Sequence, residues 1–174
     1  MATGDGSETG EVRMPDDLTV AQRVVVRRAL AVAVRLCRDV VALSDDALGA
    51  LVERIMGARP TPSRLAGIRR DYQRIGDHLA AMTPDQFRNQ PGGAYYAEVD
   101  PDDATAITLG DDFWDADRRG IDTTAGTLVH EASHFLVVRG TDDHAYGDEI
   151  EELGLTLARN NADTLERVAE EAAQ

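Results

Sequence analysis

The sequence has no lysine, only one cysteine and no apolar run long enough to span a bilayer. Because Cys37 has no second cysteine to pair with, no disulfide can form within the chain, and folding needs no oxidising compartment. All 18 basic residues are arginine, and the net charge is −14. An acidic protein repels nucleic-acid phosphates and anionic membranes, so we expect neither as a partner.

The N-terminus also lacks the basic region and apolar stretch that mark a secretory signal. We therefore expect synthesis in the cytoplasm, with any export passing through a specialised secretion system. Residues 1–16 are rich in Gly, Asp, Glu, Ser and Thr, a composition typical of a disordered tail. Residues 17–174 are long enough to bury the core of one domain, which we divide into a helical part, 17–90, and a second part, 91–174, that carries the motifs described below.

Apolar periodicity and capping residues predict an α+β domain that is mostly helical. The predicted helices cover residues 18–43, 44–56, 61–82, 123–138 and, in one or two pieces with a break near residue 160, 148–171. We expect Asp122 to cap the fourth helix and Gly140 to end it. Residues 94–99 and 105–109 are predicted as the strands of a small hairpin beside that helix.

The fourth helix carries the pattern HEASH at residues 130–134. His130 and His134 are four residues apart, so both imidazoles lie on one helix face and can hold one zinc ion. Glu131 is placed to take a proton from a zinc-activated water as that water attacks a carbonyl carbon. The pattern therefore predicts a zinc metallopeptidase site.

A catalytic zinc normally has a third protein ligand and one open position. The segment GTDDHAYG at residues 140–147 offers Asp142, Asp143 and His144, all within reach of the metal. A carboxylate would neutralise one positive charge of the ion, whereas His144 would complete an all-imidazole set. The chemistry of the ligands does not choose among the three.

With these two segments the sequence resembles the aspzincin metallopeptidases, which include deuterolysin and the fungal peptidyl-Lys metalloendopeptidases. Their signature is HExxH followed by GTxDxxYG, and both parts are present here. Clear resemblance covers residues 94–171, whereas the first three predicted helices match only in general character. The resemblance implies a zincin-like fold and a zinc-dependent endopeptidase acting on protein or peptide substrates.

The resemblance also implies a role for individual residues. Asp143, nine residues after the second histidine, is implied as the third ligand of one Zn²⁺ per chain. Tyr146 is implied as the residue whose hydroxyl stabilises the oxyanion of the tetrahedral intermediate. His144 falls at a variable position of the pattern and is expected to face solvent.

A preference for lysine is suggested by the stretch NADTLE at residues 161–166, which resembles the acidic pocket of the Lys-specific members. Asp163 and Glu166 are three apart and share a helix face, so they could bind an ammonium group on the residue after the scissile bond. The alternative is a solvated acidic helix face, since the whole C-terminal region is acidic. The absence of lysine would also protect such an enzyme from its own activity, but a general composition bias towards arginine predicts the same absence.

Other functional classes remain open at this stage. The missing disulfides depart from the secreted fungal members and suggest a cytoplasmic enzyme or a bacterial toxin or effector peptidase. Such a chain would have a carrier or an inhibitor protein as a partner. The alternatives to an enzyme are a non-catalytic acidic interaction module on a degenerate peptidase fold, and a zinc site with a purely structural role. The adjacent Glu131 argues against the structural role.

Overall fold

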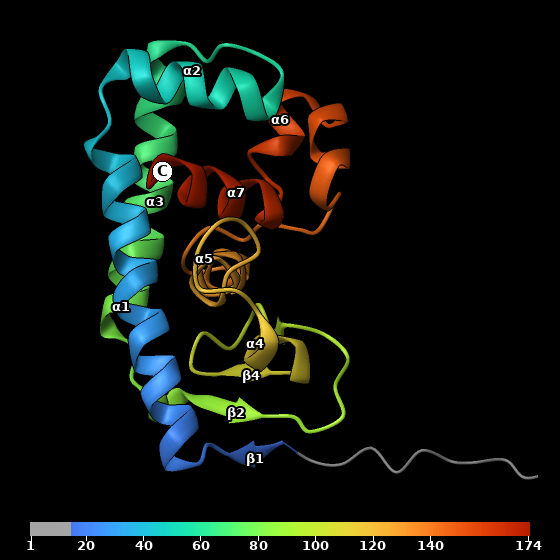
Figure 1. Cartoon of the computed structure of the whole chain (residues 1–174). Helices are drawn as coiled ribbons and strands as arrows, with labels where there is room; N and C mark the ends of the chain where they lie inside the picture. The colour runs from blue at the N-terminus through green and yellow to red at the C-terminus, as the bar shows by residue number, and fades with distance from the viewer. Residues whose placement is uncertain (1–14) are drawn as a thin grey trace, which may run out of the picture.

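The computed structural model describes residues 15–174. Two long antiparallel helices, α1 (Val20–Ala42) and α3 (Pro62–Ala81), form one side of the molecule, and α2 (Asp45–Met56) lies across one end of them (Figure 1). The side chains of Thr19, Ser44 and Thr61 cap the three helices by accepting hydrogen bonds from backbone amides in the first turn. The three N-terminal helices predicted from the sequence are therefore confirmed, with ends that differ by at most two residues.

A small mixed sheet lies beside the N-terminal half of α1 (Figure 1). Its strands are β1 (Asp16–Asp17), β2 (Phe87–Asn89), β3 (Ala97–Glu98) and β4 (Ile107–Leu109), in the order β1-β2-β4-β3. β3 and β4 pair antiparallel, so the predicted hairpin is confirmed with shorter strands. β2 follows the short helix η1 (Pro84–Gln86), runs parallel to β4 and was not predicted. Residues 1–14 of the predicted tail, which covered residues 1–16, lie outside the described residues. Asp16, at the end of that range, pairs with Asn89 in the sheet.

The helix that carries the motif, α5 (Thr124–His134), lies between the sheet and the C-terminal helix α7 (Ala162–Ala172) (Figure 1). All of its residues except His134 are buried, because α1, α3 and α7 all pack against it. The remaining helical segments are α4 (Asp111–Asp115), η2 (Gly147–Glu152) and α6 (Gly154–Ala158). α6 ends just before residue 160, which confirms the predicted break. No helix among residues 15–174 is long and apolar enough to cross a bilayer.

The two predicted ends of the motif helix are wrong. The N-cap is Thr123, whose hydroxyl accepts a hydrogen bond from the Gly126 amide at 2.9 Å, and Asp122 precedes it with a φ of 55°. The helix ends at His134 instead of Val138, because the amides of residues 138–140 all turn back to the carbonyl of Phe135. Phe135 is fully buried and anchors this turn, which sends the chain back towards the motif.

Candidate metal centre and active site

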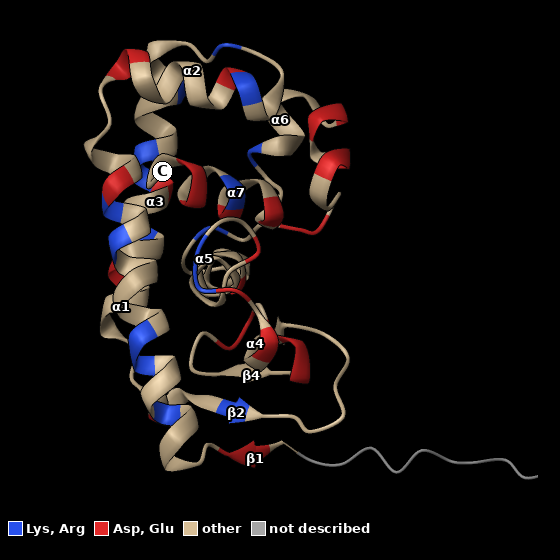
Figure 2. Ribbon diagram, viewed as in Figure 1, with Lys and Arg blue, Asp and Glu red and all other residues tan. Residues whose placement is uncertain are grey.

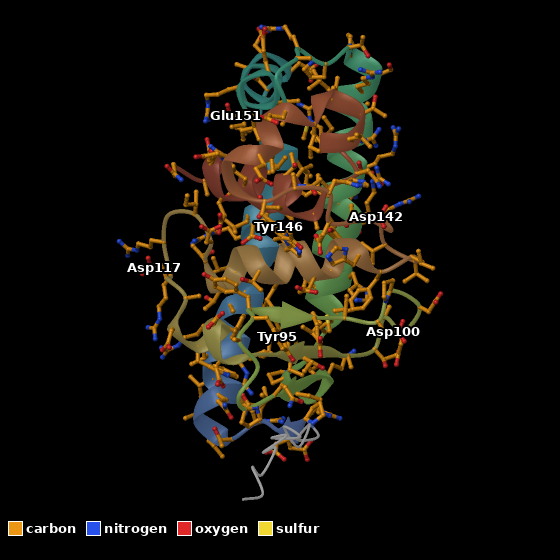
Figure 3. The ribbon with its side chains drawn as sticks, turned by 90° about the vertical axis from the view of Figure 1, so that its right-hand side faces the viewer. Tyr95, Asp100, Asp117, Asp142, Tyr146 and Glu151 are labelled. Carbon is orange, nitrogen blue, oxygen red and sulfur yellow. The ribbon has the colours of Figure 1, made fainter. Side chains whose placement is uncertain are left out.

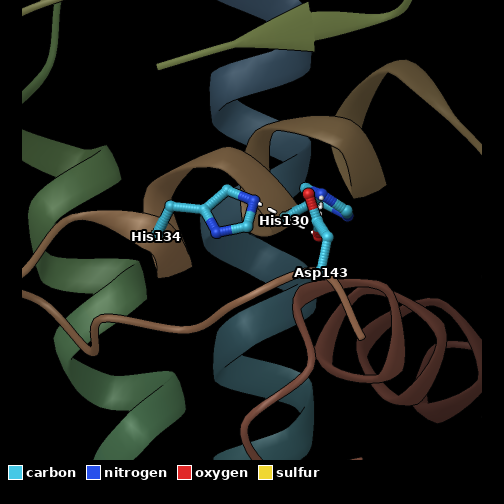
Figure 4. Close-up of side chains that lie close together, drawn as sticks. All are labelled: His130, His134 and Asp143. Carbon is cyan, nitrogen blue, oxygen red and sulfur yellow. Dashed lines mark ion pairs between the residues drawn. The ribbon is translucent and has the colours of Figure 1, made fainter. Parts of the chain in front are cut away.

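Three potential metal ligands converge on one face of α5 (Figure 4). His130 and His134 are one turn apart, with ring centroids separated by 5.0 Å. Asp143 comes from the loop after α5, and its Oδ1 lies 3.2 Å from His130 Nε2 and 3.5 Å from His134 Nε2. These three atoms are close enough to share one ion.

The structure separates the three candidates for the third ligand. Asp143 reaches both histidines, whereas His144 is exposed and lies next to Asp142 and Asn160. The Nε2 atom of His144 is 3.3 Å from the Asn160 amide nitrogen and 3.8 Å from the Asp142 carboxylate. Neither Asp142 nor His144 belongs to a metal-binding group among the described residues.

The two histidines are held in the orientation that a metal requires. The Nδ1 of His134 lies 2.9 Å from the carbonyl oxygen of Thr141, so Nδ1 donates a proton and Nε2 is left to bind a metal. The Nδ1 of His130 lies 3.2 Å from a carboxylate oxygen of Glu166, which fixes its ring in the same sense. Two imidazole nitrogens and one carboxylate oxygen are ligands that zinc prefers, so the residues present fit a zinc ion.

Without a metal, the same cluster is a network of ion pairs. Burial lowers the pKa of His130, but hydrogen bonds to Asp143 and Glu166 outweigh burial and raise it to about 10. Burial raises the pKa of Asp143, but its hydrogen bonds with His130 and His134 hold it well below its usual range. A metal ion entering the cluster therefore replaces the protons that these side chains share.

Glu131 lies beside the cluster and is almost completely buried, with 5% of its surface exposed. Burial raises the pKa of its carboxyl group to about 7, although the neighbouring His130 and His134 oppose the shift. A carboxyl group with a pKa near neutrality can both accept and return a proton during a reaction. Its position is thus compatible with the base predicted from the motif.

Tyr146 lies on the α7 side of α5, facing solvent (Figure 3). Its ring is stacked on His130, with centroids 6.3 Å apart and planes inclined by 12°, and 55% of the residue is exposed. Burial of the hydroxyl and its hydrogen bond to Asp143 raise the pKa of the phenol above its usual value. The group therefore stays protonated and can donate a hydrogen bond to an oxygen in the site.

Two pockets flank the potential ligands. A pocket of about 310 Å³ on the His134 side is lined by Ala97, Glu98, Val99 and Pro101 together with motif residues. A pocket of about 210 Å³ on the His130 side is lined by Tyr95, Tyr96, Asp122, Asp163 and Glu166. Glu131, Asp143 and Ala97 line both, so the metal centre lies between two hollows that a polypeptide could occupy.

The structure brings the two predicted pocket carboxylates to the site but gives them different environments. Glu166 is 7% exposed and contacts His130, while burial raises the pKa of its carboxyl group to about 7. Asp163 accepts a hydrogen bond from the Gly147 amide at 3.0 Å, and burial also raises its pKa. The solvated-face alternative is therefore wrong for Glu166, which is buried.

Sequence reasoning missed how α7 holds the motif helix. Glu170 accepts hydrogen bonds from the Thr123 amide at 2.8 Å and from the Asp122 amide at 3.0 Å, so it binds the N-terminus of α5. A Cβ atom on Gly126 would lie 2.1 Å from a Glu170 oxygen and 2.5 Å from a Glu166 oxygen, so any larger residue would displace these carboxylates. The sequence shows that Glu166 and Glu170 are four residues apart and share a helix face. It does not show their partners His130 and Thr123, which lie about 40 residues earlier in the chain.

Comparisons with known proteins support the resemblance noted in the sequence. An aspzincin family model described as lysine-specific metallo-endopeptidase matches residues 63–170, which adds the third helix to the range expected. An "Extracellular protease" of Aeromonas hydrophila is 47% identical over 81 residues, covering 44% of this chain and 23% of that protein. A "Peptidyl-Lys metalloendopeptidase" of Pleurotus ostreatus is 42% identical over 96 residues, covering 52% and 55%. The chain thus spans about a quarter to a half of the length of these relatives.

A solved structure, the zinc peptidase from Grifola frondosa, has the same fold. It superposes with a TM-score of 0.74 at 23% identity, covering 90% of this chain and 98% of that one. The predicted α+β, zincin-like fold is therefore confirmed, including the N-terminal helices that resembled the family only in general character.

Proposed function

Because the chain belongs to the aspzincin family of lysine-specific metallo-endopeptidases, we propose that it hydrolyses internal peptide bonds of protein or peptide substrates. The family uses zinc, and the group His130, His134 and Asp143 is suited to hold it. The observation that carries the proposal is the convergence of these three ligands beside the buried Glu131, between two pockets. We assign the three residues as zinc ligands, Glu131 as general base and Tyr146 as oxyanion donor.

The proposed reaction divides the chemistry among few side chains. The zinc ion supplies Lewis acidity towards the attacking water and the scissile carbonyl. Glu131 takes a proton from the water and then returns it to the nitrogen of the leaving amine, a role that suits a buried carboxyl group lining both pockets beside the three ligands. Tyr146 donates its hydroxyl proton in a hydrogen bond to the carbonyl oxygen as negative charge develops there.

We further propose that the pocket on the His130 side receives a lysine side chain following the scissile bond. Asp163 and Glu166 contribute two carboxylates to this pocket, and Tyr95 and Tyr96 contribute aromatic surface. An ammonium group between the carboxylates would offset the cost of burying them, which is the cost that raises their pKa values. Tyrosine faces attract the same group by cation–π interaction. The name of the Pleurotus ostreatus relative agrees with this preference.

Digestion of a denatured lysine-containing proteome, followed by mass spectrometry of the new termini, tests both proposals. We expect new N-termini that begin with lysine, and we expect a zinc chelator to abolish them. Cleavage without enrichment of lysine would support the peptidase proposal but refute the proposal that the pocket on the His130 side binds lysine. If the folded, zinc-loaded protein cleaves nothing, the peptidase proposal fails and the non-catalytic interaction module becomes the better interpretation.

A further inference from the structure

The side chain of Asn161 is fully buried at the N-terminus of α7, and all of its polar atoms are used. Its Oδ1 accepts hydrogen bonds from the amides of His144, at 2.7 Å, and Ala145, at 3.1 Å. Its Nδ2 donates to the carbonyl oxygen of Ala145, at 2.9 Å, and to the hydroxyl of Thr164, at 3.0 Å. One amide group thus satisfies three backbone groups of the loop that follows the motif helix.

These hydrogen bonds of Asn161 hold the part of the loop that connects two proposed functional residues. Residues 144 and 145 stand between Asp143 and Tyr146, the proposed zinc ligand and the proposed oxyanion donor. On the other side of Asp143, the Asp142 amide donates to the Asn160 carbonyl at 3.0 Å, and the Asp142 carbonyl accepts from the Ala162 amide at 3.1 Å. The start of α7 therefore holds the chain on both sides of Asp143.

Apart from these backbone hydrogen bonds and the polar contacts of the Asp142, Asp143 and Tyr146 side chains, the loop has little apolar packing to fix it. Asp142, Asp143, His144 and Tyr146 are exposed, and Ala145 is the one buried side chain among residues 142–146. A single methyl group gives too little contact to define a loop conformation, whereas two amides and a carbonyl in a buried environment must be hydrogen-bonded. The conformation of this loop therefore depends on backbone partners, and Asn161 supplies three of them.

We infer that Asn161 is a positioning residue that presets Asp143 and Tyr146 for zinc binding and catalysis. The inference rests on the proposed function, because it assumes that Asp143 binds zinc. Without the side chain of Asn161, both amides lose their acceptor and the loop can leave the geometry in which Asp143 Oδ1 faces the two histidines. Zinc then binds to a centre that must first be ordered, so its affinity falls.

Zinc affinity of the metal-free variants Asn161→Ala and Asn161→Asp, measured by competition with a chelating dye, tests this inference. We expect Asn161→Ala to bind zinc about 10–100-fold more weakly, the usual loss when a partner supporting a ligand is removed. Asn161→Asp keeps an acceptor for the two amides but loses both donated hydrogen bonds, so we expect a smaller loss. With zinc at saturation, kcat should fall more than KM rises, because Tyr146 is displaced as well. The visible spectrum of the cobalt-substituted variants should change.

Tyr72→Phe is the matched control. The Tyr72 hydroxyl is buried and donates to the carbonyl oxygen of Leu165 in α7 at 2.7 Å, far from the loop in sequence. Its loss should lower Tm but leave zinc affinity and the cobalt spectrum unchanged. If both Asn161 variants, or Asn161→Asp alone where Asn161→Ala does not fold, lower Tm yet bind zinc like the parent, the inference is overturned. A parent protein that binds zinc tightly but cleaves nothing would refute the proposed function and leave this test valid.

Discussion

Two carboxylates of α7 look equivalent in the sequence but differ at the scale of the residue. Glu166 points its carboxylate at Nδ1 of His130, whereas Asp163 binds the backbone of Gly147. Glu166 thus belongs both to the pocket and to the support of a proposed zinc ligand, while Asp163 belongs to the pocket and the loop. Mutations at the two positions should therefore have different signatures.

For Asp163→Asn we expect a reduced preference for lysine with nearly normal zinc affinity, since the asparagine oxygen can still accept from the Gly147 amide. For Glu166→Gln we expect both to fall, with zinc affinity reduced by about tenfold, because a neutral amide orients the His130 ring less strongly. Cleavage-site profiling and chelator competition on the two variants provide the measurements. Equal zinc affinities in both variants would show that Glu166 does not support the ligand.

Glu131 is expected to act in proton transfer without binding the metal. Glu131→Gln should retain zinc and lower kcat by about 10²–10⁴-fold, the usual contribution of a general base. Turnover of a peptide at saturating zinc, with metal content measured after dialysis, gives both quantities. Glu149→Gln is the control, because Glu149 is an exposed acid outside the pocket. Activity close to that of the parent would reject Glu131 as the base.

At the scale of elements, the sequence predicts what is local. The first three helices have apolar periodicity and N-caps at Thr19, Ser44 and Thr61, so their ends could be predicted within two residues. β2 has only three residues, and its partner β4 lies some 20 positions later in the chain. So short a segment shows no alternation of apolar and polar residues from which a strand could be predicted. The end of α5 depends on the buried Phe135 and on a hydrogen bond from the Leu136 amide to the Pro101 carbonyl. Because Pro101 is distant in the sequence, this end could not be predicted from local residues.

The same limit applies to the site. The spacing of the two histidines on a helix predicts that they share a face, and the structure brings them together. The choice of Asp143 over its neighbours came from family resemblance, because its position depends on contacts with the start of α7. The sequence does not show whether an asparagine is buried or exposed, so the hydrogen bonds of the buried Asn161 to the loop could not be predicted.

The packing of α5 against α7 gives a prediction for Gly126. Gly126→Ala places a methyl group against the carboxylates of Glu166 and Glu170, which must move. We expect a loss of about 1–3 kcal/mol in the free energy of unfolding, typical of overpacking, and weaker zinc binding because Glu166 leaves His130. Gly49→Ala, in the middle of α2, is the control, since a Cβ atom there would meet only the side chain of Arg59, at 3.7 Å. There alanine should be neutral or stabilising. Similar losses of stability in both variants would contradict the proposed contact.

At the scale of the whole molecule, the negative charge is concentrated around the site. Residues 91–174 contain 20 Asp and Glu against 5 Arg, whereas residues 1–90 contain 12 against 13. Arginines follow α1 and α3 on one side, and acidic residues gather around α4, η2 and the loop between α5 and η2 on the other (Figure 2). A cationic substrate approaching the site is therefore attracted over long range, and an anionic one is repelled.

This asymmetry predicts a salt dependence that separates steering from pocket binding. For a peptide with one lysine at the cleavage site and several flanking arginines, kcat/KM should fall by about tenfold from low to high salt. Charges further apart than about 10 Å are screened at 0.1 M salt, so a contact inside the pocket is affected much less. The control is a peptide with the same lysine at the cleavage site, in which flanking glutamates balance the basic residues so that the net charge is zero. Its kcat/KM should change little with salt. If the two peptides respond equally to salt, the acidic surface plays no part in capturing substrate, and any lysine preference must come from the pocket alone.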